Sequence, residues 1–157
     1  MKRIRCASLV AGALLFLSLL CSAAGAGEGR YYGVVESVDR GHLVVRTTKH
    51  STGSWTIDSH TRIEGSIAKY DWVSVELGRG SHIAWLRLEE HPTSHTGVVR
   101  EVHNRVLAVH SGRELEHWNI TDATLGETEV AERDEISVKV YGNHNLAEIK
   151  ILRHGVR

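Results

Sequence analysis

The chain has 157 residues and carries 19 basic and 19 acidic side chains, so its formal net charge is zero. Beyond the first 26 residues the two signs are interspersed rather than clustered, which argues against nucleic acid as a partner. Both cysteines, Cys6 and Cys21, lie within the first 26 residues, so the rest of the chain has no disulfide, thiolate metal site or covalently attached haem.

Residues 1–26 have the pattern of a secretory signal peptide. Lys2, Arg3 and Arg5 precede an uncharged run that is rich in leucine and ends in small residues, which suits cleavage after Ala24 or Ala26. Cleavage would leave 16 basic and 19 acidic side chains, a net charge of −3 with histidine neutral. We therefore expect a secreted or periplasmic protein of the bacterial cell envelope.

Two other fates of this segment stay open. Cys21 could become the acylated first residue of a lipoprotein, although Leu20 before it is bulkier than that processing normally accepts. The uncharged run also reaches the roughly 20 residues that span a bilayer, although its last third is mostly alanine and glycine. We expect contact with a membrane only through an uncleaved signal or a lipid on Cys21.

The remainder of the chain is a tandem duplication. The segment 33–38 returns 64 residues later as 97–102, and beyond Ser54 the offset is 63, so that Trp55 matches Trp118. One slowly drifting offset across many apolar positions indicates a repeated structural unit. We place the repeats at 30–91 and 94–157, with the joint at Pro92.

Within each repeat, apolar and polar residues alternate with the period of half-buried strands. The expected strands are 33–38, 42–48, 54–58, 72–78 and 82–89, then 97–102, 106–111, 116–121, 135–141 and 145–152. Only 65–70 and 128–133 would allow one or two turns of helix. Five short strands with a small insertion before the fourth predict an all-β protein of two tandem five-stranded OB-like barrels. The short joint predicts that the barrels touch.

The repeats share an order of short motifs: Gly-x-Val-x-x-Val, Leu-x-Val, a strand, a threonine, a box around Asp71 and a final strand with alanine. This order resembles a widespread family of bacterial secreted domains of unknown function, which implies small OB-like β-barrels. The family has glycine directly before the aspartate of the box, where this chain has Tyr70 and Arg133. These are core and turn positions, so the resemblance implies no chemistry.

No motif indicates catalysis. The sequence lacks a Gly-x-Ser-x-Gly elbow, a phosphate-binding glycine loop and a His-Glu-x-x-His pair. We expect that the protein is not an enzyme and holds no organic cofactor.

Histidine is over-represented, with 11 residues. His110 and His117 should both point outward on neighbouring antiparallel strands, and a symmetric hairpin would set them opposite with Cβ atoms roughly 5 Å apart. Such a pair would share zinc or copper, with oxygen ligands from glutamates in the connecting loop. Solvated surface histidines are the plainer interpretation, because the first repeat has Arg46 and Ser54 at these places.

Two further histidine groups are weaker candidates. His91 and His95 flank the joint and His154 matches His91, so packing of the barrels would have to bring the three together at a metal. His82 and His144 occupy corresponding turns of different repeats, and a turn position is the plain explanation for both.

An aromatic asymmetry separates the repeats. Simple alternation points Trp72, Ile83 and Trp85 outward, where the second repeat has two glutamates and a leucine. Such an apolar patch needs a cover, either the other repeat or a second molecule, or else it forms a ligand groove. Trp55 and Trp118 occupy equivalent inward positions and belong to the expected cores.

These patterns favour a non-catalytic binding or assembly module of the cell envelope, with a protein partner or self-association through Trp72, Ile83 and Trp85. The alternative is a periplasmic protein that binds divalent metal through surface histidines such as His110 and His117.

Overall fold

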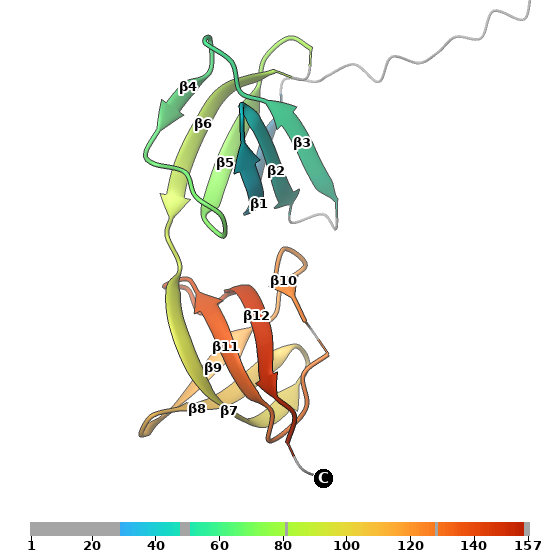
Figure 1. Cartoon of the computed structure of the whole chain (residues 1–157), viewed down its shortest axis with the longest axis vertical. Helices are drawn as coiled ribbons and strands as arrows, with labels where there is room; N and C mark the ends of the chain where they lie inside the picture. Colours follow the sequence, from blue (N-terminus) through green and yellow to red (C-terminus); the bar gives the residue numbers. More distant parts are fainter. Residues whose placement is uncertain (1–28, 48–50, 81, 128, 156–157) are drawn as a thin grey trace, which may run out of the picture.

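The computed structural model describes residues 29–47, 51–80, 82–127 and 129–155, and the expected signal peptide lies outside them. These residues form two β-barrels that follow one another along the long axis of the molecule (Figure 1), joined by the continuous run from β6 into β7. The described residues contain no helix, so none of them forms a membrane-spanning helix. The expected all-β fold is confirmed.

Each barrel contains six strands. Barrel 1 consists of β1 Arg30–Asp39, β2 His42–Thr47, β3 Thr52–Thr56, β4 Arg62–Glu64, β5 Trp72–Leu77 and β6 Ile83–Glu90. Barrel 2 consists of β7 Thr93–His103, β8 Val106–Ser111, β9 Glu114–Asn119, β10 Leu125–Gly126, β11 Glu135–Val140 and β12 Leu146–Arg153. The sheet orders β3-β2-β1-β5-β6-β4 and β9-β8-β7-β11-β12-β10 are the same, so both repeats fold alike.

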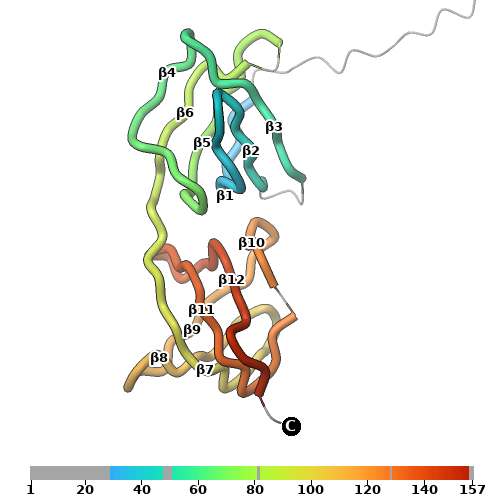
Figure 2. Tube along the Cα trace, in the orientation of Figure 1, coloured from blue at the N-terminus to red at the C-terminus, as the bar shows by residue number. Residues whose placement is uncertain are grey.

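The strand order is that of an OB-like barrel. A meander of three strands is followed by two more, and the last strand runs parallel to the end of the third, which closes the barrel. That third strand is interrupted here: β4 and β10 are its short second pieces, which the sequence pattern did not predict. The backbone trace in Figure 2 shows these pieces as short segments, β4 beside β6 and β10 beside β12.

The segments expected to allow helix are turns instead. Asp71 N donates to Ala68 O at 3.3 Å, and Tyr70, the third residue of this turn, has φ 77°. That geometry is a type II turn, which favours glycine at its third position. Arg133 has φ 70° in the matching turn of barrel 2. Tyr70 and Arg133 thus occupy positions that favour glycine, at a cost in backbone strain.

Glycine opens the repeated motif because the neighbouring strand lies too close for a side chain. A Cβ atom on Gly33 would lie 2.1 Å from Arg46 O, and one on Gly97 would lie 2.5 Å from His110 O. The close approach bends β1 and β7 onto their partners, and it explains why this glycine is present in both copies.

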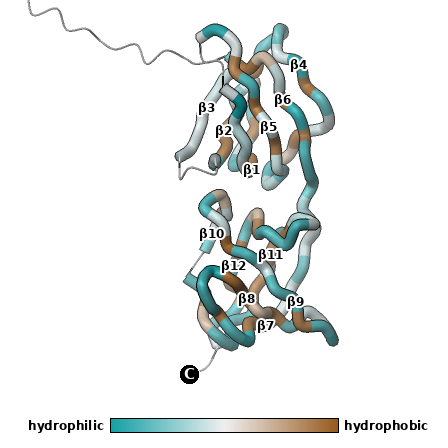
Figure 3. The backbone as a smooth tube through the Cα atoms, turned by 180° about the vertical axis from the view of Figure 1, so that it is seen from behind, coloured by the Kyte–Doolittle hydropathy of each residue, from teal (hydrophilic) through white to brown (hydrophobic). Residues whose placement is uncertain are grey.

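Each barrel encloses its own apolar core. Trp55 and Trp118 are buried at matching places, which confirms their inward orientation. Figure 3 shows apolar residues along the strands and hydrophilic residues over the turns and the joint. The cores are small, so each barrel depends on a few large side chains.

A β-bulge changes the orientation of residues at the start of β6. Leu77 pairs with Ile83 but Glu76 pairs with Trp85, so Ala84 is an extra residue. Ile83 therefore points into the core and is 1% exposed, while Ala84 is exposed. The expected outward orientation of Ile83 is wrong. It was based on strict alternation of side chains, which the extra residue in the bulge interrupts.

The two barrels are in contact beside the joint, as expected. The hydroxyl of Tyr141 donates to Tyr70 O at 2.5 Å, and its ring lies edge-on to Trp72 with centroids 5.9 Å apart. Glu90 Oε1 accepts the backbone N–H of Gly142 at 2.5 Å. The apolar part of this barrel contact consists of Val34, Tyr70 and Trp72 from barrel 1 with Ala123, Leu125, Tyr141 and Ala147 from barrel 2.

Candidate functional site

The expected aromatic patch does not form one surface. Trp72 lies in the barrel contact and Ile83 lies in the core of barrel 1. Trp85 lies on the outer wall, where three guanidinium groups cover its ring at 6.0, 5.0 and 4.1 Å from the centroid, those of Arg30, Arg62 and Arg87. The cover that Trp72 needs is supplied by the other repeat, and Trp85 is covered by its own barrel.

The arginines around Trp85 are themselves paired. Glu64 accepts from Arg62 at 2.7 Å and from Arg87 at 2.9 Å, and Glu76 accepts from Arg30 at 3.0 Å. The wall thus holds three arginines and two glutamates around one ring, because Glu64 pairs with two of the arginines. Trp85 Nε1 is buried within it and has no hydrogen-bond partner among the described residues.

His110 and His117 lie on one face of barrel 2, but they are not opposite each other. In the β8–β9 ladder His110 pairs with Leu115 and His117 pairs with Ala108. The two histidines are therefore diagonal neighbours, with Cβ atoms about 7–8 Å apart. The expected cross-strand geometry is wrong because the strands stay paired up to Ser111 and Glu114, so the two-residue turn is centred one residue nearer to His110 than an opposite pair requires. Metal binding by this pair stays a prediction.

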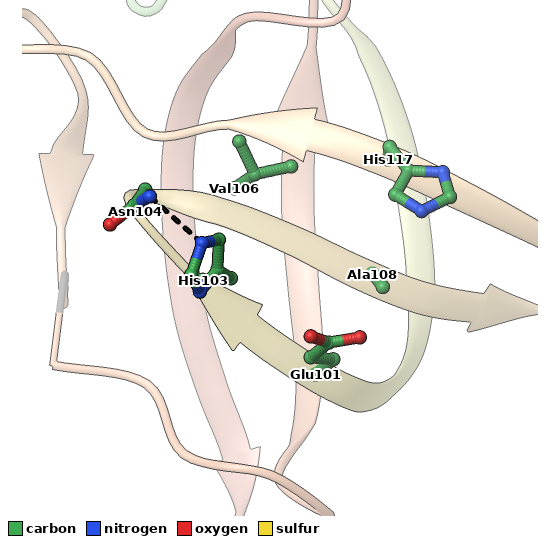
Figure 4. Close-up of a pocket in the computed structure, with 6 residues that line it drawn as sticks. All are labelled: Glu101, His103, Asn104, Val106, Ala108 and His117. Carbon is green, nitrogen blue, oxygen red and sulfur yellow. Dashed lines mark hydrogen bonds between the residues drawn. The ribbon is translucent and has the colours of Figure 1, made fainter.

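His117 borders a hollow on the outer face of β7, β8 and β9 (Figure 4). Glu101, Ala108 and His117 form one row across the three strands, and the small side chain of Ala108 leaves space between the other two. The hollow has a volume of about 440 Å³ and is lined by Glu101, His103, Asn104, Val106, Ala108 and His117. Its floor is apolar and its rim carries imidazole, amide and carboxylate groups.

The same histidine also borders a groove along the edge of β9. This groove has a volume of about 450 Å³ and is lined by Leu115, Glu116, His117, Asn119, Asn143 and His144. Leu115 is 50% exposed there. His144 has φ 64° in the loop that forms the far wall, and backbone strain of this kind in a non-glycine residue often accompanies a binding site.

β9 is the last strand of its sheet, and its outer edge is open over most of its length. Asn119 N donates to His144 O at 2.8 Å, and this end alone is bridged to the loop before β12 within the described residues. Backbone groups of alternate residues point to the same side of a strand. The amides and carbonyls of Leu115 and His117 therefore point into the groove, away from β8.

The other three candidate histidines contact residues at separate places in the fold. His91 Nδ1 lies 2.7 Å from Asp71 Oδ1, and His154 Nδ1 lies 3.4 Å from Asp134 Oδ1, at matching places of separate barrels. His95 packs against the ring of Trp118. The structure does not bring the three histidines together, and no group of three or more metal-ligating side chains surrounds a cation position among the described residues.

No family model and no curated protein matches the chain. Among solved structures, one described as "drosophila Unr CSD456" aligns with 82% of this chain at 16% identity and a TM-score of 0.34. The chain spans 64% of the length of that structure. A similarity at this level carries no argument, so the OB-like assignment rests on the strand order. Membership of the bacterial secreted family stays a prediction.

Proposed function

We propose that this chain is a non-catalytic binding module of the bacterial cell envelope, and that it captures an extended segment of a partner protein along β9. The observation that carries the proposal is the open edge of β9 between two hollows that share His117. The proposed compartment follows from the pattern of the first 26 residues.

An extended segment added to β9 would find both kinds of contact that strand addition uses. The backbone groups of Leu115 and His117 supply main-chain hydrogen bonds to a segment in the groove, and the hollow beside His117 accepts one of its side chains. Exposed Leu115 favours an apolar side chain opposite it, and the imidazoles and amides on the rim favour a polar neighbour. Barrel 1 has Thr52, Gly53 and Ser54 at the matching places, so its edge strand has neither the leucine nor the imidazole.

His117→Pro is expected to weaken binding without unfolding barrel 2. The proline ring removes the N–H that points into the groove, and proline is tolerated on an edge strand because the β8–β9 ladder does not use this group. Peptides selected from a random display library on the wild-type protein should lose at least about tenfold in affinity, which corresponds to about one main-chain hydrogen bond.

Two matched variants complete the experiment. His117→Ser, the residue of barrel 1, keeps the N–H and should retain most of the affinity, whereas Ser54→Pro places proline on the matching edge of barrel 1 and should change nothing. Equal loss in His117→Pro and Ser54→Pro, or full affinity in His117→Pro, would show that β9 is not the binding edge. Amide hydrogen exchange should show protection of Leu115 and His117 by the peptide.

A further inference from the structure

Asp58 orients the imidazole of His82 in a hollow at the end of barrel 1 that lies away from the barrel contact. His82 Nδ1 lies 3.0 Å from Asp58 Oδ2, and the backbone N–H of His60 donates to Asp58 Oδ1 at 2.8 Å. The hollow has a volume of about 480 Å³ and is lined by Asp58, His60, Gly78, Arg79, His82, Ile83 and Ala84. It is open because Gly78 stands where barrel 2 has Tyr141.

The fold does not require these three side chains. Barrel 2 makes the same turn with a threonine hydroxyl: Thr124 Oγ1 accepts Thr121 N at 2.8 Å, as Thr61 Oγ1 accepts Asp58 N at 3.1 Å. The places of Asp58, His60 and His82 hold Thr121, Ala123 and Asn145 in barrel 2. The aspartate–histidine pairs near the ends of β6 and β12, by contrast, are present in both barrels. The Asp58–His82 pair is therefore an addition specific to barrel 1.

The contact between Asp58 and His82 fixes the direction of the imidazole. With Nδ1 at the carboxylate oxygen, Nε2 is the ring nitrogen that remains free for a ligand. This arrangement of carboxylate and imidazole is the one that orients histidine ligands in metal sites.

We propose that His60 and His82 bind one divalent cation of the zinc and copper class, with Asp58 as the outer partner of His82. Imidazole suits these borderline metals, and two imidazoles leave the other coordination positions to water. Among the described residues that line the hollow, Arg79 is the one arginine or lysine, and Asp58 carries the opposite charge. Two protein ligands make a labile site, which exchanges its metal with other ligands.

Cu²⁺ titrated into the purified protein by calorimetry, with Zn²⁺ in parallel, tests the site. One equivalent should bind, and the electron paramagnetic resonance spectrum of the Cu²⁺ form should show coupling to two nitrogen nuclei. The substitutions His60→Ala and His82→Asn introduce the residues of barrel 2, so the fold should tolerate them. Each should lower the affinity at least about tenfold, and Asp58→Asn should lower it by about 10- to 100-fold.

The matched control is the double variant His110→Arg with His117→Ser, which introduces the residues of barrel 1 on the other histidine pair. It should bind Cu²⁺ like the wild type. Arg79→Gly, again a residue of barrel 2, should strengthen binding because it removes a positive charge from the hollow. Unchanged affinity in folded His60→Ala and His82→Asn variants, loss in the double variant, or no stoichiometric binding by the wild type would each overturn the proposal.

Discussion

Replacing Trp72 with glutamate is expected to separate the two barrels and to lower the free energy of unfolding by about 3 kcal/mol. The indole packs edge-on against Tyr141 in the apolar contact. Complete burial of a tryptophan removes about 150–250 Å² from water at about 25 cal/mol per Å², or about 4–6 kcal/mol, and the value of about 3 kcal/mol is lower because Trp72 is only partly buried. Glutamate is the residue that barrel 2 carries at the matching position 135, so barrel 1 itself should still fold. The loss should appear as a lower melting temperature at constant mass in sedimentation.

Trp85→Glu is the matched control for this substitution. Position 148 of barrel 2 also holds glutamate, and Trp85 lies on the outer wall away from Tyr141. A carboxylate among the surrounding arginines should leave the melting temperature within a few degrees of the wild type, since exposed ion pairs contribute about 0–1 kcal/mol. Equal losses at both positions, or a change of mass with Trp72→Glu, would show that Trp72 does not act through the barrel contact.

The hydroxyl of Tyr141 makes a separate contribution to the same contact. Burial raises the pKa of Tyr141, and the carboxylates of Asp71 and Glu90 act in the same direction. The hydroxyl therefore stays protonated and donates to the backbone oxygen of Tyr70. Its removal would leave a poorly solvated carbonyl, so the contact has a polar anchor beside its apolar one.

The apolar rings of the barrel contact lie at one end of each barrel. Trp72 and Tyr141 meet in the middle, but the matching places at the outer ends hold Glu135 and Gly78. The apolar rings are thus confined to the faces that are covered. One of these outer ends contains the hollow of His60 and His82.

The repeat offset and the alternation of residues were sufficient to predict the two barrels. Both patterns depend on inward positions such as Trp55 and Trp118, which keep their character because the small cores cannot accept polar groups. The barrel contact followed in outline from the short joint, although Tyr141 was not identified as its centre. Tyr141 matches Gly78 of the first repeat. Comparison of these two positions would have shown that only the second repeat has an aromatic ring there.

The candidate site depended on features that sequence periodicity does not contain. The bulge at Ala84 reverses the orientation of Ile83, and the register of one hairpin moves His117 away from His110 and beside Ala108. Both are set by hydrogen-bond geometry over one or two residues. The open edge of β9 was also absent from the sequence prediction, because it results from where the third strand breaks.

Replacing Asp134 with asparagine is expected to lower the free energy of unfolding by about 3 kcal/mol at neutral pH. The carboxylate is buried and accepts the backbone N–H groups of Ala131 at 2.9 Å and Gly155 at 3.0 Å. An amide supplies a single oxygen and turns its own N–H₂ toward the second donor, so one buried donor is left without an acceptor. Thermal melting of the variant measures this loss.

The loss of stability caused by Asp134→Asn should become smaller as the pH falls. The two backbone donors lower the pKa of Asp134 below its ordinary value, and the neighbouring His154 adds to this effect. The unfolded chain therefore binds the proton more readily than the folded one, and the stabilisation is fully present above the unfolded pKa of about 3.9. This stabilisation disappears as the pH falls through the lower, folded-state pKa.

The difference in free energy of unfolding between wild type and Asp134→Asn should consequently be constant from pH 7 to about pH 5 and shrink below about pH 4. The exposed neighbour Glu132, changed to glutamine, should show no such difference. A gap between wild type and Asp134→Asn that stays constant down to pH 2.5 would show that the charge of Asp134 does not stabilise the turn.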